Sequence, residues 1–403
     1  MMIKKIINGH LVMPEGITDG TLLLENGKIR GIGTQAPTPA AGNAPGASAA
    51  AEGEVLDAAG LFVCPGLLDE HVHAYSRGKA RLDFLTEPKA AAEAHLMAGT
   101  TTITPSIAYS VPRPDFLEAI RRIRRVIAEE DTTIAGIHFE GPFVNPRFGA
   151  HSERAWKYDS ASFRALLGAA GEDLLHMTYA PELPFAPELE RELSARGIVM
   201  DLGHTAFSAA DAERAKKAGA TVITHLFDAM GCCHGPESIA DTGDLQEQAS
   251  AIALSLEGFY YELICDSRCC HVKPASQRLA LRTAGEDRII TISDASVSEE
   301  PYDPADYPAS DLKSVRDLSI NDIGQLTGSR LSVLESARNF MNTTGCGLRI
   351  AVKTASYNPA RALGLSGRVG SLLPGRDADI LFTDEALTLK RVIRHGETVT
   401  VME

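Results

Sequence analysis

Short apolar runs alternate with amphipathic stretches between residues 61 and 365. The apolar runs have the length of strands, and the amphipathic stretches have the periodicity of helices. Roughly eight such strand–helix units predict a parallel sheet with right-handed crossovers, and eight units close a barrel. We therefore expect an α/β fold, a (β/α)8 TIM-like barrel over residues 61–365. The expected helices are Pro88–Ala98, Phe116–Glu130, Ser162–Ala170, Pro187–Arg196, Ala209–Ala218, Pro274–Ala284, Val333–Thr343 and Leu348–Ala355.

Both ends of the chain have β patterns instead. Residues 2–34 are short apolar stretches broken by turn pairs, and the tail after residue 366 returns to the same pattern. Isolated hairpins are marginal in water, so we expect residues 1–60 and 366–403 to pair with each other. Residues 35–54 are rich in Ala, Pro and Gly, which predicts a mobile surface loop. The turn pairs are Asn8-Gly9, Glu15-Gly16, Asp19-Gly20 and Asn26-Gly27.

The first candidate for chemistry is a His-x-His pair. His71 and His73 end the apolar run that begins at Leu61. Side chains at i and i+2 of a strand point to the same face, so the two imidazoles would project side by side. In a parallel barrel this carboxyl end of the strands is where active sites lie. The pair alone also fits a solvated strand face.

Four more polar residues each follow a short apolar run, namely Glu140, His204, His225 and Asp294. Singly, each has an ordinary structural explanation, such as a helix cap or a core histidine. Together with the His-x-His pair they place imidazoles and carboxylates at one end of the predicted barrel. That set of ligands suits zinc, iron or manganese. An aspartate in such a site is placed to take a proton from an activated water.

The order His-x-His, Glu, His, His, Asp resembles that of the amidohydrolase superfamily. The sequence segments around these residues resemble those of one branch, the N-acetylglucosamine-6-phosphate deacetylases. The matching segments are His138-Phe-Glu-Gly-Pro-Phe143, Gly149-Ala-His151, Gly203-His-Thr205, Thr224-His-Leu-Phe-Asp-Ala-Met230, Ser293-Asp-Ala295, Leu326-Thr-Gly-Ser329 and Ala355-Ser-Tyr-Asn-Pro-Ala360. The resemblance implies that the chain ends form a small β-sandwich domain beside the barrel. It also implies a homodimer and a small-molecule substrate.

The same resemblance assigns roles to the polar residues. Glu140, His204 and His225 would hold one divalent metal ion, and His71 with His73 would complete a second, adjacent site. Asp294 would bind metal and act as the proton shuttle. We therefore expect one or two metal ions per chain, zinc first and iron or manganese as alternatives. The implied substrate-side residues are Ala150, His151, Asp228, Ala229 and His271.

The chain departs from the resembled family where that family binds phosphate. Asp228 stands in place of an asparagine, and the arginine expected a few residues later is missing. A carboxylate repels a phosphate dianion, and losing a guanidinium removes a bidentate partner. These changes predict selection against a phosphorylated substrate. Against this, Arg77, Lys79 and Arg81 follow the His-x-His pair and offer a replacement anion site.

Composition narrows the range of partners and cellular locations. The 403-residue chain has a net charge of −14, which argues against nucleic acid as a partner. It has no apolar run of eighteen residues, and the residues after Met1 lack the features of a signal peptide, so we expect no membrane association and a cytoplasmic location. Its seven cysteines include the vicinal pairs at 232–233 and 269–270, which fit reduced thiols rather than a disulfide framework.

Three functions remain open. The first is a metal-dependent hydrolase that removes an acyl group, most simply acetyl, from an amino sugar or a related N-acyl compound. The second is another amidohydrolase reaction, such as ring opening or deamination on a non-phosphorylated substrate. Members of that kind with a bridging lysine would need Lys where Glu140 stands. The third is a non-catalytic binding protein, which would be expected to have lost some of the six polar residues.

Overall fold

A barrel of eight parallel strands forms the centre of the computed structural model, which describes residues 2–33, 54–77, 80–129, 131–232, 248–297, 308, 310–321 and 323–400. Its strands are β6 (Leu67–Val72), β9 (Thr100–Ala108), β10 (Ile137–Glu140), β11 (Leu174–Tyr179), β12 (Val199–Leu202), β13 (Ala220–Ile223), β14 (Tyr260–Ile264) and β15 (Ile289–Ile292). Neighbouring strands follow the chain order from β6 to β15. The barrel closes where the Asp294 amide donates to the His71 carbonyl at 2.9 Å.

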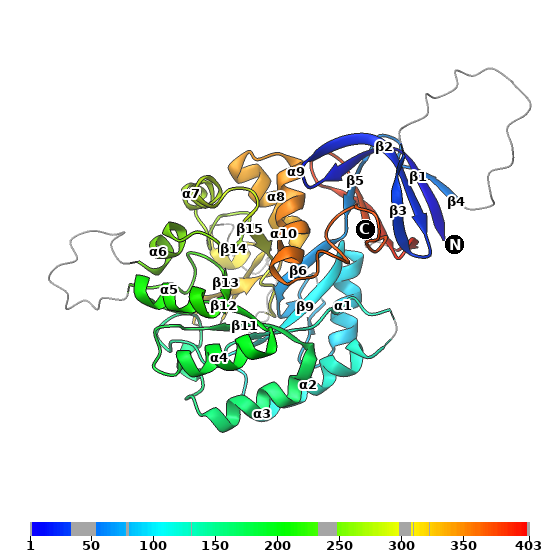
Figure 1. Ribbon diagram of the computed structural model, residues 1–403. Helices are drawn as coiled ribbons and strands as arrows, with labels where there is room; N and C mark the ends of the chain where they lie inside the picture. Colours follow the sequence, from blue (N-terminus) through cyan, green and yellow to red (C-terminus); the bar gives the residue numbers. More distant parts are fainter. Residues whose placement is uncertain are drawn as a thin grey trace, which may run out of the picture.

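Helices pack around the outside of these strands (Figure 1). They are α1 (Pro88–Met97), α2 (Arg113–Ile127), α3 (Ser160–Ala170), α4 (Ala186–Arg196), α5 (Ala209–Ala218), α6 (Ala249–Ser255), α7 (Pro274–Ala284), α8 (Val333–Thr344), α9 (Leu348–Thr354) and α10 (Tyr357–Ala362). The predicted (β/α)8 barrel is confirmed. Helices α6 and α10 were not predicted from the sequence.

The two chain ends pair in one sheet, as predicted, and form the small β-sandwich domain (Figure 1). Its strands are β1 (Ile3–Met13), β2 (Gly16–Glu25), β3 (Lys28–Gly33), β4 (Glu54–Asp57), β5 (Phe62–Pro65), β18 (Ile380–Thr383), β19 (Leu389–Arg394) and β20 (Glu397–Val399). The order is β20-β19-β18-β5-β1-β2-β3, with β4 beside β1. Strand β5 therefore joins the two ends. It is followed directly by β6, so the small domain anchors the first barrel strand.

Two of the four predicted turns in this domain are wrong. Asn8-Gly9 lies inside β1 at a register shift, with Asn8 in the left-handed region (φ 56°). Asp19-Gly20 lies inside β2. Both glycines serve close packing, since a Cβ would come within 2.5 Å of Val63 at Gly9 and 3.0 Å of Leu11 at Gly20. The other two turn pairs do connect strands.

Two short hairpins complete the fold. The first is β7 (Ala74–Tyr75) with β8 (Leu82–Asp83), and the second is β16 (Leu318–Ile320) with β17 (Leu326–Ser329). The loop predicted at residues 35–54 lies outside the described residues, except that Glu54 begins β4. Within the described part of the chain, no helix is both long enough and apolar enough to span a membrane.

Candidate metal centre

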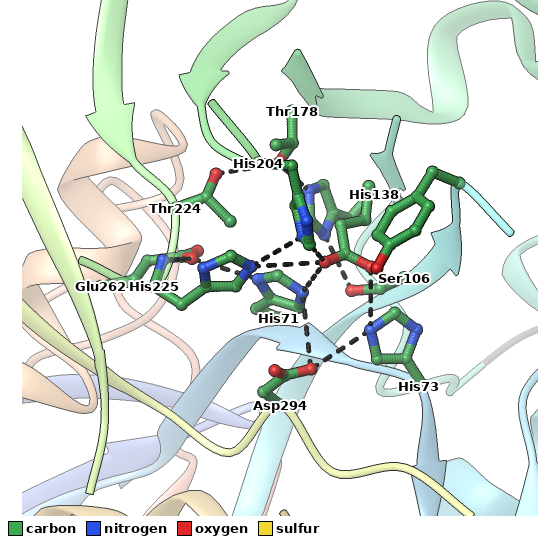
Figure 2. Close-up of polar contacts among 12 residues, drawn as sticks. His71, His73, Ser106, His138, Thr178, His204, Thr224, His225, Glu262 and Asp294 are labelled. Carbon is green, nitrogen blue, oxygen red and sulfur yellow. Dashed lines mark hydrogen bonds and ion pairs between the residues drawn. The ribbon is translucent and has the colours of Figure 1, made fainter. Parts of the chain in front are cut away.

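The six polar residues predicted to form the centre meet at the carboxyl end of the barrel. His71 lies in β6 and His73 follows that strand, while Glu140 is the last residue of β10. The other three, His204, His225 and Asp294, each come two residues after β12, β13 and β15. Figure 2 shows the imidazoles and the Asp294 carboxylate pointing toward a common centre. All of them are buried except His73, which is partly exposed.

Glu140 lies between two groups of this centre, His204 with His225 in the first half and His71 with His73 in the second half. Its Oε1 atom lies 2.8 Å from His204 Nε2 and 3.4 Å from His225 Nε2. Its Oε2 atom lies 3.3 Å from His73 Nε2, and Oε1 is 3.6 Å from His71 Nε2. Glu140 is therefore placed to bridge the His204/His225 group and the His71/His73 group.

Asp294 closes the second half. Its Oδ1 atom lies 3.3 Å from His73 Nε2 and 3.7 Å from His71 Nε2. The backbone of Asp294 is fixed, because its carbonyl accepts a hydrogen bond from the Ser329 amide at 2.8 Å. The predicted shuttle thus sits on a rigid turn, with its carboxylate beside the His-x-His pair.

Three of these residues adopt left-handed backbone conformations: His204 (φ 48°), His225 (φ 26°) and Asp294 (φ 44°). Such conformations are uncommon outside glycine and cluster at functional sites. Each occurs just after a barrel strand, where the chain must leave the sheet. The strained backbone turns each side chain toward the mouth of the barrel instead of letting it continue along the strand.

The tautomers of His204 and His225 follow from their outer contacts. Nδ1 of His204 lies 3.0 Å from the Phe148 carbonyl oxygen, and Nδ1 of His225 lies 3.2 Å from the Asp228 carbonyl oxygen. Carbonyl oxygens only accept hydrogen bonds, so each Nδ1 carries the proton. The two Nε2 atoms are then lone-pair donors, and they face each other at 3.0 Å.

His71 is oriented in the same way, since its Nδ1 contacts the Glu262 carboxylate at 3.1 Å. Its buried Nε2 has no hydrogen-bond partner among the described residues. Inward lone pairs on several imidazoles, with a carboxylate between them, repel one another unless a cation lies among them. The donors are those that a divalent transition metal takes, with outer hydrogen bonds that fix each ring. The residues therefore fit a metal centre.

The surroundings keep the two carboxylates ionised. Burial alone would raise the pKa of Glu140, but the close contacts with His204 and His225 hold it well below its ordinary value. Burial likewise acts to raise the pKa of Asp294, and the contacts with His71 and His73 lower it. Both groups therefore provide negative charge at neutral pH, as metal ligands require.

A second group of potential ligands, His138, His176 and Asp201, lies deeper in the barrel. The imidazole rings of His138 and His176 are stacked, with centroids 4.0 Å apart and an angle of 7° between the ring planes. Both nitrogens of His138 contact hydroxyl oxygens, at 2.8 and 3.0 Å. The nitrogens of His176 contact a threonine hydroxyl at 3.1 Å and Asp201 at 2.6 Å. Parallel rings with every nitrogen engaged do not converge on a metal ion, so this group is a structural hydrogen-bond network.

A cavity of about 300 Å³ opens above the metal-centre residues. Four predicted substrate-side residues line it, namely Ala150, His151, Asp228 and Ala229. The fifth, His271, does not line it. Its Nδ1 contacts Asp266 at 3.0 Å, and its buried Nε2 has no hydrogen-bond partner among the described residues. The structure thus groups four of these five residues around the cavity.

Tyr109 and Asp83 are among the residues of this cavity wall that sequence reasoning missed. Tyr109 follows β9, its hydroxyl donates to the Ala150 carbonyl, and its ring centroid lies 4.5 Å from that of His204. Asp83 ends β8 and accepts a hydrogen bond from the Leu85 amide at 2.7 Å. The signal for Tyr109 was its place directly after Thr100–Ala108, a stretch rich in β-branched residues. Asp83 lies in a two-residue strand that no periodicity reveals.

The arginines that follow the His-x-His pair make their contacts outside the cavity. Arg77 pairs with Glu335 at 2.7 Å, and Arg81 donates to the Ser76 hydroxyl at 3.0 Å. Neither arginine lines the cavity. Lys79 lies outside the described residues. The side chains of both arginines are therefore engaged outside the cavity.

Comparison with known proteins agrees with this geometry. Residues 62–399 match the Amidohydrolase family. The chain is similar to the N-acetylglucosamine-6-phosphate deacetylase of Bos taurus, with 29% identity over 87% of this chain and 86% of that protein. The similarity to the Bacillus subtilis protein of the same name is 28% over 91% of this chain and 89% of that protein.

Solved structures show the same fold. The N-acetylglucosamine-6-phosphate deacetylase of Pasteurella multocida superposes with a TM-score of 0.81 at 20% identity, covering 99% of this chain and all of that one. A mutant of the Mycobacterium smegmatis enzyme, in complex with N-acetyl-D-glucosamine-6-phosphate, gives a TM-score of 0.80 at 25% identity, with both chains covered in full.

Proposed function

The chain belongs to the amidohydrolase family, and from that premise we propose a metal-dependent deacylase. It would remove an acyl group, most simply acetyl, from an amino sugar or a related N-acyl compound. The observation that carries the proposal is the convergence of six side chains, of which five line one cavity and His71 lies buried behind them; the five are His73, Glu140, His204, His225 and Asp294. The named relatives support a linear amide as the bond that is cleaved.

Glu140, His204 and His225 would hold one metal ion, and His71 with His73 would complete a second site that shares Glu140. A bound divalent cation supplies a Lewis acid that activates water and polarises the amide carbonyl. Asp294, ionised and beside His73, takes the proton of the attacking water. It then returns that proton to the leaving amine, so that the amine departs neutral.

The loop from residue 148 to residue 151 would orient the substrate. Tyr109 fixes the Ala150 carbonyl, and His204 fixes the Phe148 carbonyl. These contacts tie the loop to the metal-centre floor, so that His151 is presented to the cavity from a defined position. We propose that His151 and the Ala150 backbone contact the polar groups of the substrate.

We further propose that the substrate lacks a 6-phosphate and is neutral or cationic. The charged side chains that line the cavity are acidic, namely Asp83, Glu140, Asp228 and Asp294, beside histidines. No Lys or Arg lines it among the described residues. A phosphate dianion placed there would meet carboxylates without a guanidinium to offset them. Losing a desolvated charge pair costs on the order of 2–5 kcal/mol.

The test is a hydrolysis screen of the metal-loaded protein. N-acetylated amino sugars are compared with and without 6-phosphate, together with N-acetylated compounds that carry a second amine, by measuring kcat/KM for amine release. We expect the phosphorylated sugar to be the poorest substrate. A preference of a hundredfold or more for it would refute the altered phosphate site. Failure of every N-acyl compound, with ring opening or deamination of other amides instead, would refute the deacylase.

The identity of the metal, the oligomeric state and the location of the protein are also predictions. Zinc is the expected metal, with iron or manganese as alternatives, and elemental analysis of protein prepared without chelators identifies it. A homodimer is expected, which light scattering after size-exclusion chromatography tests. A cytoplasmic location is expected and is tested by fractionation of the source cells.

A further inference from the structure

Glu262 is a buried carboxylate with an unusual pair of neighbours. It lies in the middle of β14 (Tyr260–Ile264), between apolar residues, and its side chain has no exposed surface. One oxygen atom, Oε2, lies 3.1 Å from His71 Nδ1 and also 3.1 Å from the backbone nitrogen of His225. A single atom therefore contacts one predicted ligand from each half of the metal centre.

The two contacts fix different properties of the two histidines. A carboxylate oxygen accepts, so His71 donates through Nδ1 and its Nε2 is left as the lone-pair donor that faces Glu140 and Asp294. At His225 the contact is to the backbone, which adopts the strained φ of 26°. The next amide, Leu226 N, donates to the Glu262 carbonyl at 2.8 Å. Both bonds hold the turn that presents the His225 ring.

Folding gains little from Glu262 by itself. A buried carboxylate is costly to desolvate, and its other oxygen, Oε1, has no hydrogen-bond partner among the described residues. An apolar side chain would match the rest of the strand. The buried carboxyl group of Glu70 also interacts with Glu262, and the two contacts with metal-centre residues help to offset the cost of burial.

We propose that Glu262 is a positioning residue that sets both metal sites at once. Through His71 it fixes the ring that serves the His-x-His site, and through the His225 turn it fixes the site shared by Glu140 and His204. This inference rests on the proposed metal centre. Loss of Glu262 should therefore weaken metal binding in both sites, although Glu262 itself touches neither metal position.

Asp201 provides a matched control. It is also a fully buried carboxylate inside a barrel strand, β12, and also contacts a histidine, with Oδ2 2.6 Å from His176 Nδ1. His176, however, is not a predicted ligand. Substitution of Asp201 should cost stability as a buried charge does, while leaving the rings of His71 and His225 in place.

The experiment compares Glu262→Leu and Glu262→Gln with Asp201→Leu and Asp201→Asn. Zn²⁺ content is measured by elemental analysis, Zn²⁺ affinity by competition with a chelator, and ligand geometry by the visible spectrum of the Co²⁺-substituted protein. Thermal unfolding checks the fold of each variant. None of these readouts depends on a substrate.

We expect Glu262→Leu to bind Zn²⁺ about 10–100-fold more weakly, with an altered Co²⁺ spectrum. Glu262→Gln keeps an acceptor oxygen without the charge and should fall between that variant and the wild type. Both Asp201 variants should keep wild-type metal content. If Glu262→Leu does not fold, Glu262→Gln against Asp201→Asn decides, and equal affinities in that pair overturn the proposal.

Two further results separate this inference from the proposed function. A folded Glu262→Leu variant with wild-type affinity and spectrum overturns the positioning role and leaves the metal centre intact. A wild-type protein that binds no Zn²⁺ or Co²⁺ overturns the metal centre, and the positioning role with it.

Discussion

Replacing Asp294 with asparagine tests the proposed proton shuttle with the smallest change in shape. The substitution exchanges one carboxylate oxygen for an amide nitrogen. The backbone of this residue is held on both sides, by the His71 carbonyl at 2.9 Å and the Ser329 amide at 2.8 Å. Neither bond involves the side chain, so the turn and its left-handed conformation should survive. Glu140 and the four histidines should retain the metal.

The expected loss in turnover follows from what remains in the cavity. Removing a general acid–base group costs a factor of about 10²–10⁴ in rate. Each decade corresponds to about 1.36 kcal/mol, so the barrier rises by roughly 2.7–5.5 kcal/mol. The upper half of that range applies here, because the nearest other carboxylate cannot take over. Glu140 has Oε1 2.8 Å from His204 and Oε2 3.3 Å from His73, so both oxygens are engaged.

The assay is steady-state hydrolysis of the best N-acyl substrate at matched metal content. Asp83→Asn is the control, since Asp83 lines the same cavity and its asparagine would still accept the hydrogen bond from the Leu85 amide. On a neutral substrate the control should stay within about fivefold of the wild type, as removal of a group outside the reaction would. Asp294→Asn with full metal and activity within tenfold of the wild type would refute the shuttle.

Three further outcomes are expected. Changing His204 and His225 together to alanine should remove at least one metal ion per chain by elemental analysis, and unchanged metal content would contradict the ligand assignment. Asp228→Asn should raise kcat/KM for the phosphorylated sugar relative to the unphosphorylated one, by removing a repulsive carboxylate from the cavity wall; an unchanged ratio would contradict a charge effect there. Hydrogen bonds from Arg349, together with Lys353, lower the pKa of Glu286 from 4.5 to about 2, so the stabilisation it provides is present above pH 4.5 and lost as the pH falls through 2. The melting temperature of Glu286→Gln should therefore approach that of the wild type across that window, and a constant difference would refute the pairing.

The convergence of the six polar residues at one rim of the barrel could be predicted from the sequence for a physical reason. Strands of a parallel barrel all run in one direction, so polar residues that end apolar runs meet at one rim whatever lies between them. His71 and His73 share a strand face by alternation alone. The place of each of these residues at the rim could therefore be predicted before any contact was known.

Residues that act from inside a strand were not predictable in the same way. Glu262 interrupts the apolar run Tyr260–Ile264, and its partners are distant in sequence. A charged residue in a buried strand signals a buried partner but does not identify it. The turn pair at Asn8-Gly9 failed for the opposite reason, because the local signal was clear and close packing against Val63 overrode it. Contacts between distant segments decided both cases.

The place of β5 between β1 and β18 has a consequence for how the protein is made. Strand β5 ends at Pro65, and its partner β18 begins at Ile380, more than three hundred residues later. During synthesis, one edge of β5 therefore stays unpaired until almost the whole chain has left the ribosome. An exposed strand edge invites pairing with other chains. Synthesis of this protein is therefore most exposed to aggregation before β18 is released, and a chain that stops short of Ile380 would leave that edge open permanently, next to the strand that carries His71.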